Sequence, residues 1–155
     1  MIKPMTFLFT TWEGGGSVTP AIEAARKLAA RGHRVRFMSE ECNRPEAEAI
    51  GVTFVAWNRA LNRKERSRDS QTYRDWAAAT PQEGLRSVIR DIWCGQSLAY
   101  ARDVIDEMHR EPAELVVTSG YLFGGGVGGE RLGQGWTGVD TNARFSLLPR
   151  SPSAV

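Results

Sequence analysis

One segment organises this chain: Phe7-Leu-Phe-Thr-Thr-Trp-Glu-Gly-Gly-Gly-Ser-Val-Thr-Pro20. An apolar, β-rich run stops at three glycines, and a helix is expected to begin at Thr19 and Pro20. Threonine can cap a helix by accepting a hydrogen bond from an early N–H, and proline loses nothing at the first helical position. A strand, a glycine-rich turn and a helix N-terminus together suit an anionic or polar ligand. The alternative is an α/β turn that binds nothing.

Composition narrows the class of protein. The chain has 155 residues, enough for one domain with a core, and its 20 basic and 18 acidic side chains are scattered. A net charge of +2 argues against a nucleic-acid binder. Cys42, Cys94 and the two histidines lack zinc-site or disulfide spacing, so we expect no metal and a cytoplasmic location. The sequence has no apolar run of ~18 residues and no export signal, which predicts no membrane span.

The order of strands and helices predicts a doubly wound parallel sheet, the Rossmann-like α/β class. Strands are expected at about 5–12, 34–38, 52–57, 115–119 and 135–141, and helices at about 20–31, 45–50 and 81–109, the last divided near Gly95. Short βαβ links and right-handed crossovers predict the strand order 3-2-1-4-5. The architecture also requires a helix before the last strand, although the glycines between Gly124 and Gly129 would each cost it up to ~1 kcal/mol.

Residues 58–70 are polar and densely charged, so a solvated, mobile loop is expected there. Tyr73 and Trp76 follow this segment at helical spacing. These two aromatic side chains either pack in the core, which is their usual place, or line a ligand pocket.

Ligands in doubly wound sheets bind at the carboxyl ends of the strands, where the strand order reverses. In the predicted order this point lies between the first and fourth strands. It brings Glu13 to Ser17 next to Ser119 to Tyr121. The sequence therefore predicts one crevice formed by these two loops.

Two glycine patterns partly match a dinucleotide-binding fingerprint. Gly14-x-Gly16 has Thr19 at the place of the third glycine, while Glu40 ends the second strand at a tolerable spacing for a ribose-binding acid. Residues 124–129 match formally, but they leave few residues for the helix that should follow. The sequence has no GxxxxGK[ST] motif, which excludes a P-loop. An NAD(P)-binding Rossmann protein stays open as an alternative.

Several motifs together resemble the amino-terminal domain of the GT-B glycosyltransferases. They are the glycine-rich turn with Ser17-Val-Thr-Pro20, then Leu28-Ala-Ala-Arg-Gly-His-Arg-Val-Arg-Phe37, and Ile50-Gly-Val-Thr-Phe-Val55. The likeness is strongest to the UDP-glycosyltransferase-like group that glycosylates natural products. It continues more weakly to Pro149, so residues 1–149 are expected to form one truncated domain and residues 150–155 a frayed tail.

The resemblance implies transfer of a sugar from a nucleotide sugar to a hydroxyl of a small-molecule acceptor, without a cofactor. In this family the amino-terminal domain holds the acceptor and the catalytic base, and a carboxy-terminal domain holds the nucleotide. We therefore expect the chain to be inactive alone and to meet the nucleotide sugar only through such a domain or a partner chain. A non-catalytic subunit that completes a donor-binding partner is a further alternative.

The chain departs from the family at the catalytic positions. The family's histidine base falls on Ser17, and its supporting aspartate falls on Ser119. Because a serine hydroxyl is no base near neutral pH without a partner, Glu13 is the substitute candidate. The residues expected to contact the acceptor are Gly15, Gly16, Tyr73, Trp76 and Tyr121.

Overall fold

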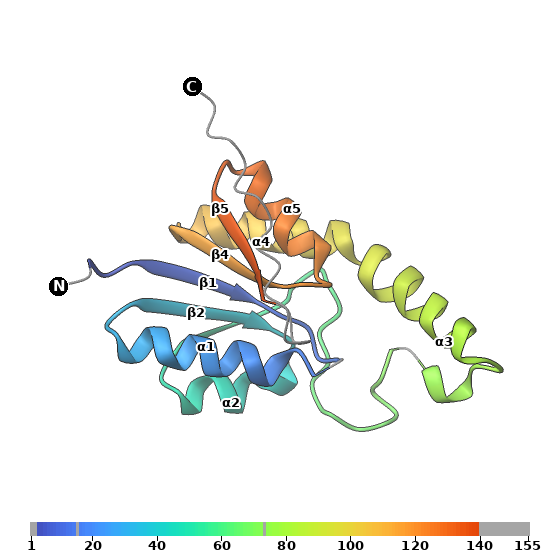
Figure 1. Cartoon of the computed structure of the whole chain (residues 1–155). Coiled ribbons are helices and arrows are strands. Elements are labelled where there is room, and N and C mark those ends of the chain that lie inside the picture. The colour runs from blue at the N-terminus through green and yellow to red at the C-terminus, as the bar shows by residue number, and fades with distance from the viewer. Residues whose placement is uncertain (1–2, 15, 73, 140–155) are drawn as a thin grey trace.

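The computed structural model describes residues 3–14, 16–72 and 74–139 of the chain. Five parallel strands form one sheet in the order β3-β2-β1-β4-β5, which confirms the predicted doubly wound topology (Figure 1). The strands are β1 (Thr6–Thr10), β2 (Arg34–Ser39), β3 (Thr53–Ala56), β4 (Leu115–Ser119) and β5 (Gly135–Val139). The α-helices are α1 (Val18–Ala30), α2 (Arg44–Ala49), α3 (Pro81–Val88), α4 (Ser97–Arg110) and α5 (Phe123–Arg131). Shorter 3₁₀ segments are η1 (Glu41–Asn43) and η2 (Asp75–Ala77), and a π-helical segment, η3 (Ile89–Cys94), follows α3.

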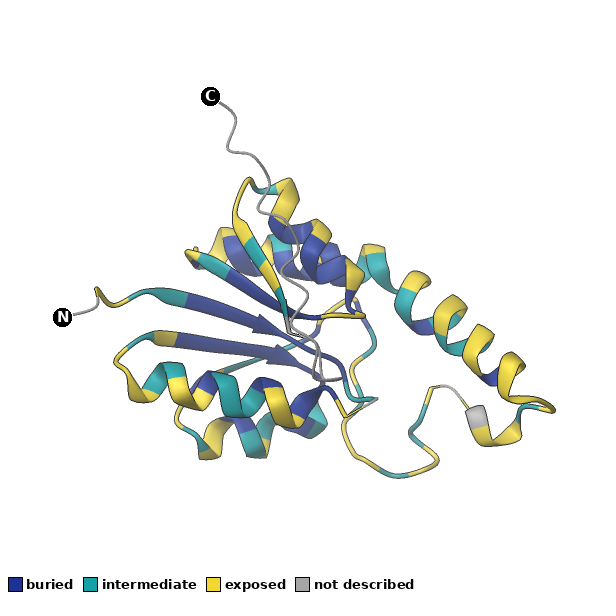
Figure 2. Ribbon diagram, in the orientation of Figure 1, coloured by how far each residue is buried: buried dark blue, intermediate teal, exposed yellow. Residues whose placement is uncertain are grey.

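Helices cover both faces of the sheet (Figure 1). Side chains alternate between the faces along each strand. Phe7 and Phe9 therefore pack with α1 and α2, while Leu8 packs with α4. The central strands β1 and β2 are buried between these two cores (Figure 2). The carboxyl ends of the strands remain at one edge of the sheet, where the connecting loops gather.

The start of α1 differs from the sequence-based expectation. The helix begins at Val18 and not at Pro20, and Ser17 occupies the N-cap position without donating or accepting a side-chain capping bond. Thr19 lies within the first turn. Gly16 precedes the cap with a φ of +72°, a left-handed conformation that glycine adopts without strain.

The glycine-rich helix α5 forms because its backbone packs directly against its neighbours. A Cβ on Gly124 would lie 2.2 Å from the carbonyl oxygen of Ser97 in α4, and one on Gly125 would lie 2.4 Å from Oγ1 of Thr118 in β4. Any side chain at these positions would push the helix away from α4 or the sheet. Close packing thus outweighs the low helix propensity of glycine.

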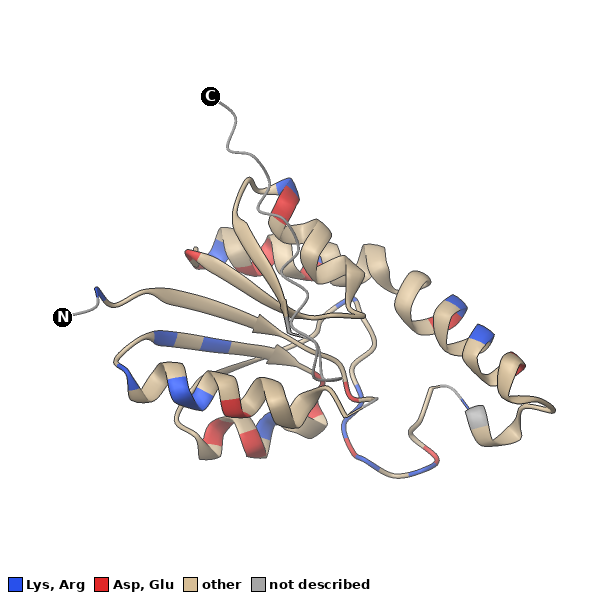
Figure 3. Cartoon of the chain, viewed as in Figure 1, with Lys and Arg blue, Asp and Glu red and all other residues tan. Residues whose placement is uncertain are grey.

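The charged segment 58–70 is anchored to the fold, which corrects the expectation of a mobile loop for its first half. The buried carboxylate of Asp103 in α4 accepts backbone N–H bonds from Asn58, Arg59 and Ala60 at 2.9 to 3.0 Å. Arg63 is held by a second buried acid, described below. Charges of both signs are otherwise spread over the helices and this segment (Figure 3).

The long helical region is divided near Gly95, as the sequence predicts, with α3 and η3 before it and α4 after it. Its first apolar stripe is less buried than expected. Leu85 and Ile89 are exposed, whereas Ile92 packs in the core. Among the described residues, no helix combines the length and apolar character needed to cross a bilayer.

Candidate functional site

The sequence predicts a crevice between the loops that follow β1 and β4, but the cavity at the first loop is bordered on its other side by Glu46 and Arg66, and neither Ser119 nor Tyr121 lines it. Thr10 in β1 pairs with Thr118 in β4, so the loops that follow these strands leave the sheet at the same edge. The first loop carries Glu13, Gly16 and Ser17, which line an open cavity of about 370 Å³ together with Arg66. Three of the predicted site residues therefore share one cavity at the N-terminus of α1.

The hydroxyl of Ser17 is engaged within the turn. Its Oγ lies 2.8 Å from the carbonyl oxygen of Trp12 and 3.0 Å from that of Gly14, and the residue is only 5% exposed. Oγ1 of Thr11 lies 3.3 Å from the same oxygen. The hydroxyl has one proton, which it can donate to either of these two carbonyl oxygens. Both oxygens belong to the turn, so Ser17 holds the shape of the turn.

The carboxylate of Glu13 faces the cavity beside two guanidinium groups. Its Oε2 lies 3.4 Å from Nε of Arg66, and its Oε1 lies 3.8 Å from Nη2 of Arg63. Arg66 continues from there to α2, where it pairs with Glu46 and donates to Oδ1 of Asn43 at 2.6 Å. The substitute base predicted from the sequence is thus part of a network of charges.

Glu40 is the buried centre of this network. It follows β2, is 3% exposed, and accepts a hydrogen bond from the N–H of Glu13 at 3.1 Å. Arg63 donates to the same carboxylate through its backbone N–H at 3.3 Å and through Nε at 3.0 Å. Burial raises the pKa of the Glu40 carboxyl above its ordinary value. Glu40 therefore ties the glycine-rich turn, the end of β2 and the charged segment together.

The sequence identified Glu40 only as an acid that could bind a ribose. In the structure its two oxygens instead accept hydrogen bonds from Glu13 and Arg63. Its role could not be read from the sequence, because its partners lie 27 and 23 residues away in the chain. The only signal of this role in the sequence was that Glu40 is an acidic residue directly after a strand expected to be buried.

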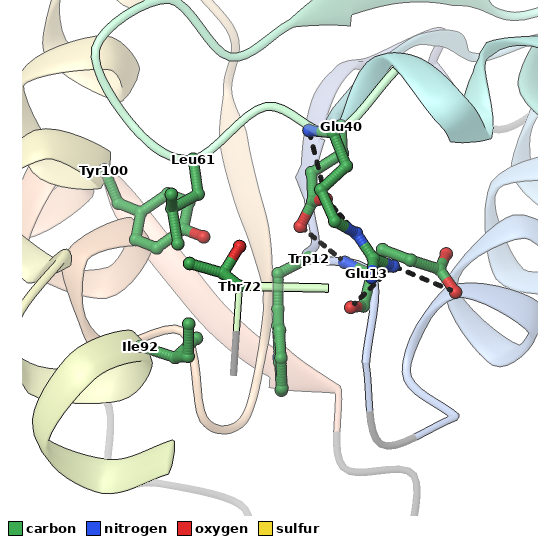
Figure 4. Close-up of a pocket in the computed structure, with 8 residues that line it drawn as sticks. Trp12, Glu13, Glu40, Leu61, Thr72, Ile92 and Tyr100 are labelled. Carbon is green, nitrogen blue, oxygen red and sulfur yellow. Dashed lines mark hydrogen bonds and ion pairs between the residues drawn. The ribbon is translucent and has the colours of Figure 1, made fainter. Parts of the chain in front are cut away.

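A second, smaller cavity opens beside the network (Figure 4). Its water-accessible volume, between Trp12, Glu40, Leu61, Arg63 and Tyr100, is only about 10 Å³, room for about one water molecule. Glu13 lines both cavities. The wall of the smaller cavity is mixed, because the polar groups of Glu40, Arg63 and Thr72 line it beside apolar side chains.

The other predicted residues are placed as follows. Ser119 is buried at the end of β4. Tyr121 is 38% exposed and stacks on Trp93, with ring centres 4.5 Å apart and planes at 9°. Trp76 is 41% exposed, with the guanidinium of Arg68 4.6 Å from its ring centre, so it is not a core residue. Gly15 and Tyr73 lie outside the described residues, as do residues 140–155.

The described part of the chain contains no group of three or more His, Cys, Asp or Glu side chains arranged to hold a metal ion. The acidic residues of the site pair with arginines. The chemistry available at the crevice is therefore that of carboxylates, guanidinium groups and hydroxyls.

Comparison with known proteins identifies the architecture. No family profile matches the chain. It is 27% identical over 126 residues to 4′-demethylrebeccamycin synthase of Lentzea aerocolonigenes, a match that covers 81% of this chain and 30% of that protein. The calicheamicin glycosyltransferase CalG4 superposes on it with a TM-score of 0.69 at 19% identity, over 90% of this chain and 33% of CalG4. The chain has the fold of one domain of the GT-B glycosyltransferases.

A further structure agrees with this assignment. The glycosyltransferase SsfS6 of Streptomyces sp. SF2575, complexed with thymidine diphosphate, superposes on the domain with a TM-score of 0.57 at 21% identity. The match covers 88% of this chain and 38% of SsfS6. The domain thus spans about a third of the length of the proteins that it resembles.

Proposed function

We propose that this chain is the acceptor-binding domain of an enzyme that transfers a sugar from a nucleotide sugar to a hydroxyl of a small-molecule natural product. The observation that carries the proposal is the cavity at the end of β1, where Glu13, Gly16 and Ser17 meet at the N-terminus of α1. It lies at the carboxyl end of β1, the edge of the sheet at which doubly wound folds bind their ligands. The fold and the relative from Lentzea aerocolonigenes support the same function.

In this proposal Glu13 is the general base. Its carboxylate accepts the proton of the acceptor hydroxyl while that oxygen forms a bond to the anomeric carbon of the sugar, and the nucleoside diphosphate leaves with the electron pair of the broken bond. Ser17 positions the turn that presents Glu13, through its contacts with two carbonyl oxygens of the turn. Ser119 lies at the carboxyl end of β4, the strand next to β1, and so at the same edge of the sheet.

The acceptor is proposed to lie over Gly15, Gly16 and the exposed ring of Tyr121. Stacking on Trp93 holds the Tyr121 ring in a fixed plane, which suits a flat, largely apolar acceptor. Tyr73 and Trp76 remain proposed acceptor contacts. The name of the relative, 4′-demethylrebeccamycin synthase, also supports a natural-product acceptor.

The nucleotide sugar is proposed to bind mainly to a second domain or partner chain, in the cytoplasm. The related SsfS6 structure, which contains thymidine diphosphate, supports a nucleoside diphosphate as the leaving group. Because transfer requires donor and acceptor to be held together, the chain alone is proposed to be inactive.

The test measures product by mass spectrometry with dTDP-glucose or UDP-glucose and the aglycone of 4′-demethylrebeccamycin. We expect no transfer by the purified chain. Transfer is expected when the chain is joined to the part of the Lentzea protein that it does not match. Turnover by the chain alone would overturn the proposal. So would strong thermal stabilisation by NAD(P) together with none by the aglycone, because that result favours a dinucleotide-binding protein.

A further inference from the structure

The smaller cavity of the site has the size of one water molecule. Its water-accessible volume is about 10 Å³, close to that of a single water-sized sphere. Size alone does not decide what such a space holds, because apolar cavities stay dry. A buried water needs about two to four polar partners in the wall. The polar groups around this cavity therefore decide its occupant.

One wall carries a buried hydroxyl that has no hydrogen-bond partner among the described residues. Tyr100, in α4, is 1% exposed, and its hydroxyl forms no hydrogen bond there. Figure 4 shows this hydroxyl directed into the space between Tyr100 and Glu40. Burial, together with the charges of Glu40 and Asp103, raises the pKa of Tyr100, so the hydroxyl keeps its proton at neutral pH. It is thus a donor in a place where an unpaired donor destabilises the fold.

The position of the Tyr100 ring is set by packing. The ring meets Trp57 edge to face, with the ring centres 4.8 Å apart and the planes at 73°. Trp57 is itself fixed, since its Nε1 donates to the carbonyl oxygen of Thr11 at 3.0 Å. The hydroxyl therefore cannot turn toward another partner without moving two buried rings.

The opposite wall supplies a charged acceptor. Oε2 of Glu40 accepts two hydrogen bonds from Arg63, whereas Oε1 accepts one, from the N–H of Glu13. A carboxylate oxygen has lone pairs for about two contacts, so Oε1 can accept one more. The remaining residues of the wall are Trp12, Glu13, Leu61, Arg63, Thr72 and Ile92.

We propose that this cavity holds one water molecule, which accepts a hydrogen bond from the Tyr100 hydroxyl and donates one to the Glu40 carboxylate. Tyr100 is then a positioning residue. Through the water it braces the acid that binds the N–H of Glu13 and the side chain of Arg63. The water site stands on the geometry of the cavity alone, whereas its importance for Glu13 rests on the proposed function, in which Glu13 is the base.

A high-resolution crystal structure of the chain tests the position of the water. We expect one ordered water within about 2.5–3.2 Å of both the Tyr100 hydroxyl and an oxygen of Glu40. A dry cavity, or a water that bonds to only one of the two groups, would overturn the inference.

Urea unfolding tests the energetic side. Tyr100→Phe removes only the hydroxyl, and Tyr121→Phe is the matched control, because Tyr121 is 38% exposed and lies outside the cavity. A hydroxyl bonded to the water contributes a net hydrogen bond, so Tyr100→Phe should raise the unfolding equilibrium constant about three- to tenfold. Tyr121→Phe should change it about twofold or less. A Tyr100→Phe chain as stable as the parent, or more stable, would show an unpaired hydroxyl and contradict the proposal.

Amide resonances of the ¹⁵N-labelled chain separate positioning from general support of the fold. The N–H of Glu13 donates to Glu40, whereas the N–H of Ala60 donates to Asp103, in the same helix as Tyr100. Tyr100→Phe should shift the Glu13 resonance more than the Ala60 resonance. Equal shifts would mean that Tyr100 only supports α4, and its role toward Glu40 would be refuted.

These experiments contain no sugar donor and no acceptor. They can fail while the joined enzyme still transfers sugar, and they can succeed while it does not. The water site and the proposed function are therefore refuted by different results.

Discussion

The chain uses glycine in two different ways, as Gly16 in the turn after β1 and Gly124 in α5 illustrate. In the turn after β1, Gly16 has a positive φ and no atom within 4 Å of the place where a Cβ would lie, and the region borders an open cavity. In α5, by contrast, a Cβ on Gly124 would overlap the backbone of α4, and one on Gly128 would be in tight contact with it at 3.0 Å. The first region opens space at the sheet edge and the second closes it. A glycine pattern in the sequence therefore does not by itself indicate a ligand site.

The largest expected effect concerns chemistry at the turn. In an enzyme completed with a donor domain, Glu13→Gln should lower kcat about 100- to 10,000-fold, since glutamine keeps the shape but cannot accept a proton. Ser17→Ala should cost less, because that hydroxyl holds the turn and does not take the proton. The measurement is initial-rate kinetics of sugar transfer with each variant.

A matched control for Glu13→Gln is Glu46→Gln, which removes the other carboxylate paired with Arg66. It should leave kcat within a few-fold of the parent enzyme. Full activity in Glu13→Gln would remove Glu13 from the mechanism and leave the turn as a purely structural element.

The next effect concerns stability in α5. Gly124→Ala should lower the free energy of unfolding by about 3 kcal/mol, because the added methyl group overlaps the Ser97 carbonyl and forces the helix away from α4. Val127 in the same helix is 56% exposed, so Val127→Ala should change the free energy of unfolding by about 0.5 kcal/mol or less. Urea unfolding followed by circular dichroism measures both. Equal effects of the two substitutions would contradict the packing argument.

Breaking the buried network beside the turn should have a smaller effect. Glu40→Gln should cost about 1–3 kcal/mol of stability, because Arg63 loses its buried partner. The cost should depend on pH. The folded state raises the pKa of Glu40 above 4.5, so it binds the proton more tightly than the unfolded chain does. The stability contributed by this group is therefore greatest below that value and declines as the pH rises through the folded pKa.

The Glu40→Gln variant cannot titrate at this position, so the difference in stability between it and the parent chain isolates the effect. That difference should be larger at about pH 4 than at about pH 7 in urea unfolding. A difference that stays constant or grows with pH would show that the folded state does not raise this pKa. The stability loss in Gly124→Ala should show no such dependence on pH, because it arises from packing.

The smallest effect concerns the conformation of the turn itself. Gly16→Ala should cost about 1–2 kcal/mol, since a left-handed backbone is strained for any residue with a Cβ. Gly32→Ala is the matched control, because Gly32 follows α1 with a φ of +84° and is equally open. Both variants should lose similar stability, but only Gly16→Ala should weaken acceptor binding. Equal affinity of both variants for the aglycone would place the acceptor away from the turn.

The strand order was predictable from the sequence, whereas the second wall of the cavity, formed by Glu46 and Arg66 instead of the loop after β4, was not. Apolar strands, short links and a glycine-rich turn are local patterns, and the right-handed crossover rule converts them into one topology. The family resemblance added the correct fold. Glu13 and Ser17 were also located correctly at the edge of the sheet, since a residue directly after a parallel strand lies at its carboxyl end.

Only the tertiary structure decided how these residues are used. The network of Glu40, Arg63 and Glu13 joins groups that lie far apart in the chain, and no local pattern specifies which acid meets which base. The anchoring of residues 58–60 by Asp103 and the formation of α5 despite its glycines have the same origin. Propensity and periodicity act within a few residues, whereas ion pairs, caps and close packing act between elements that meet only when the chain folds.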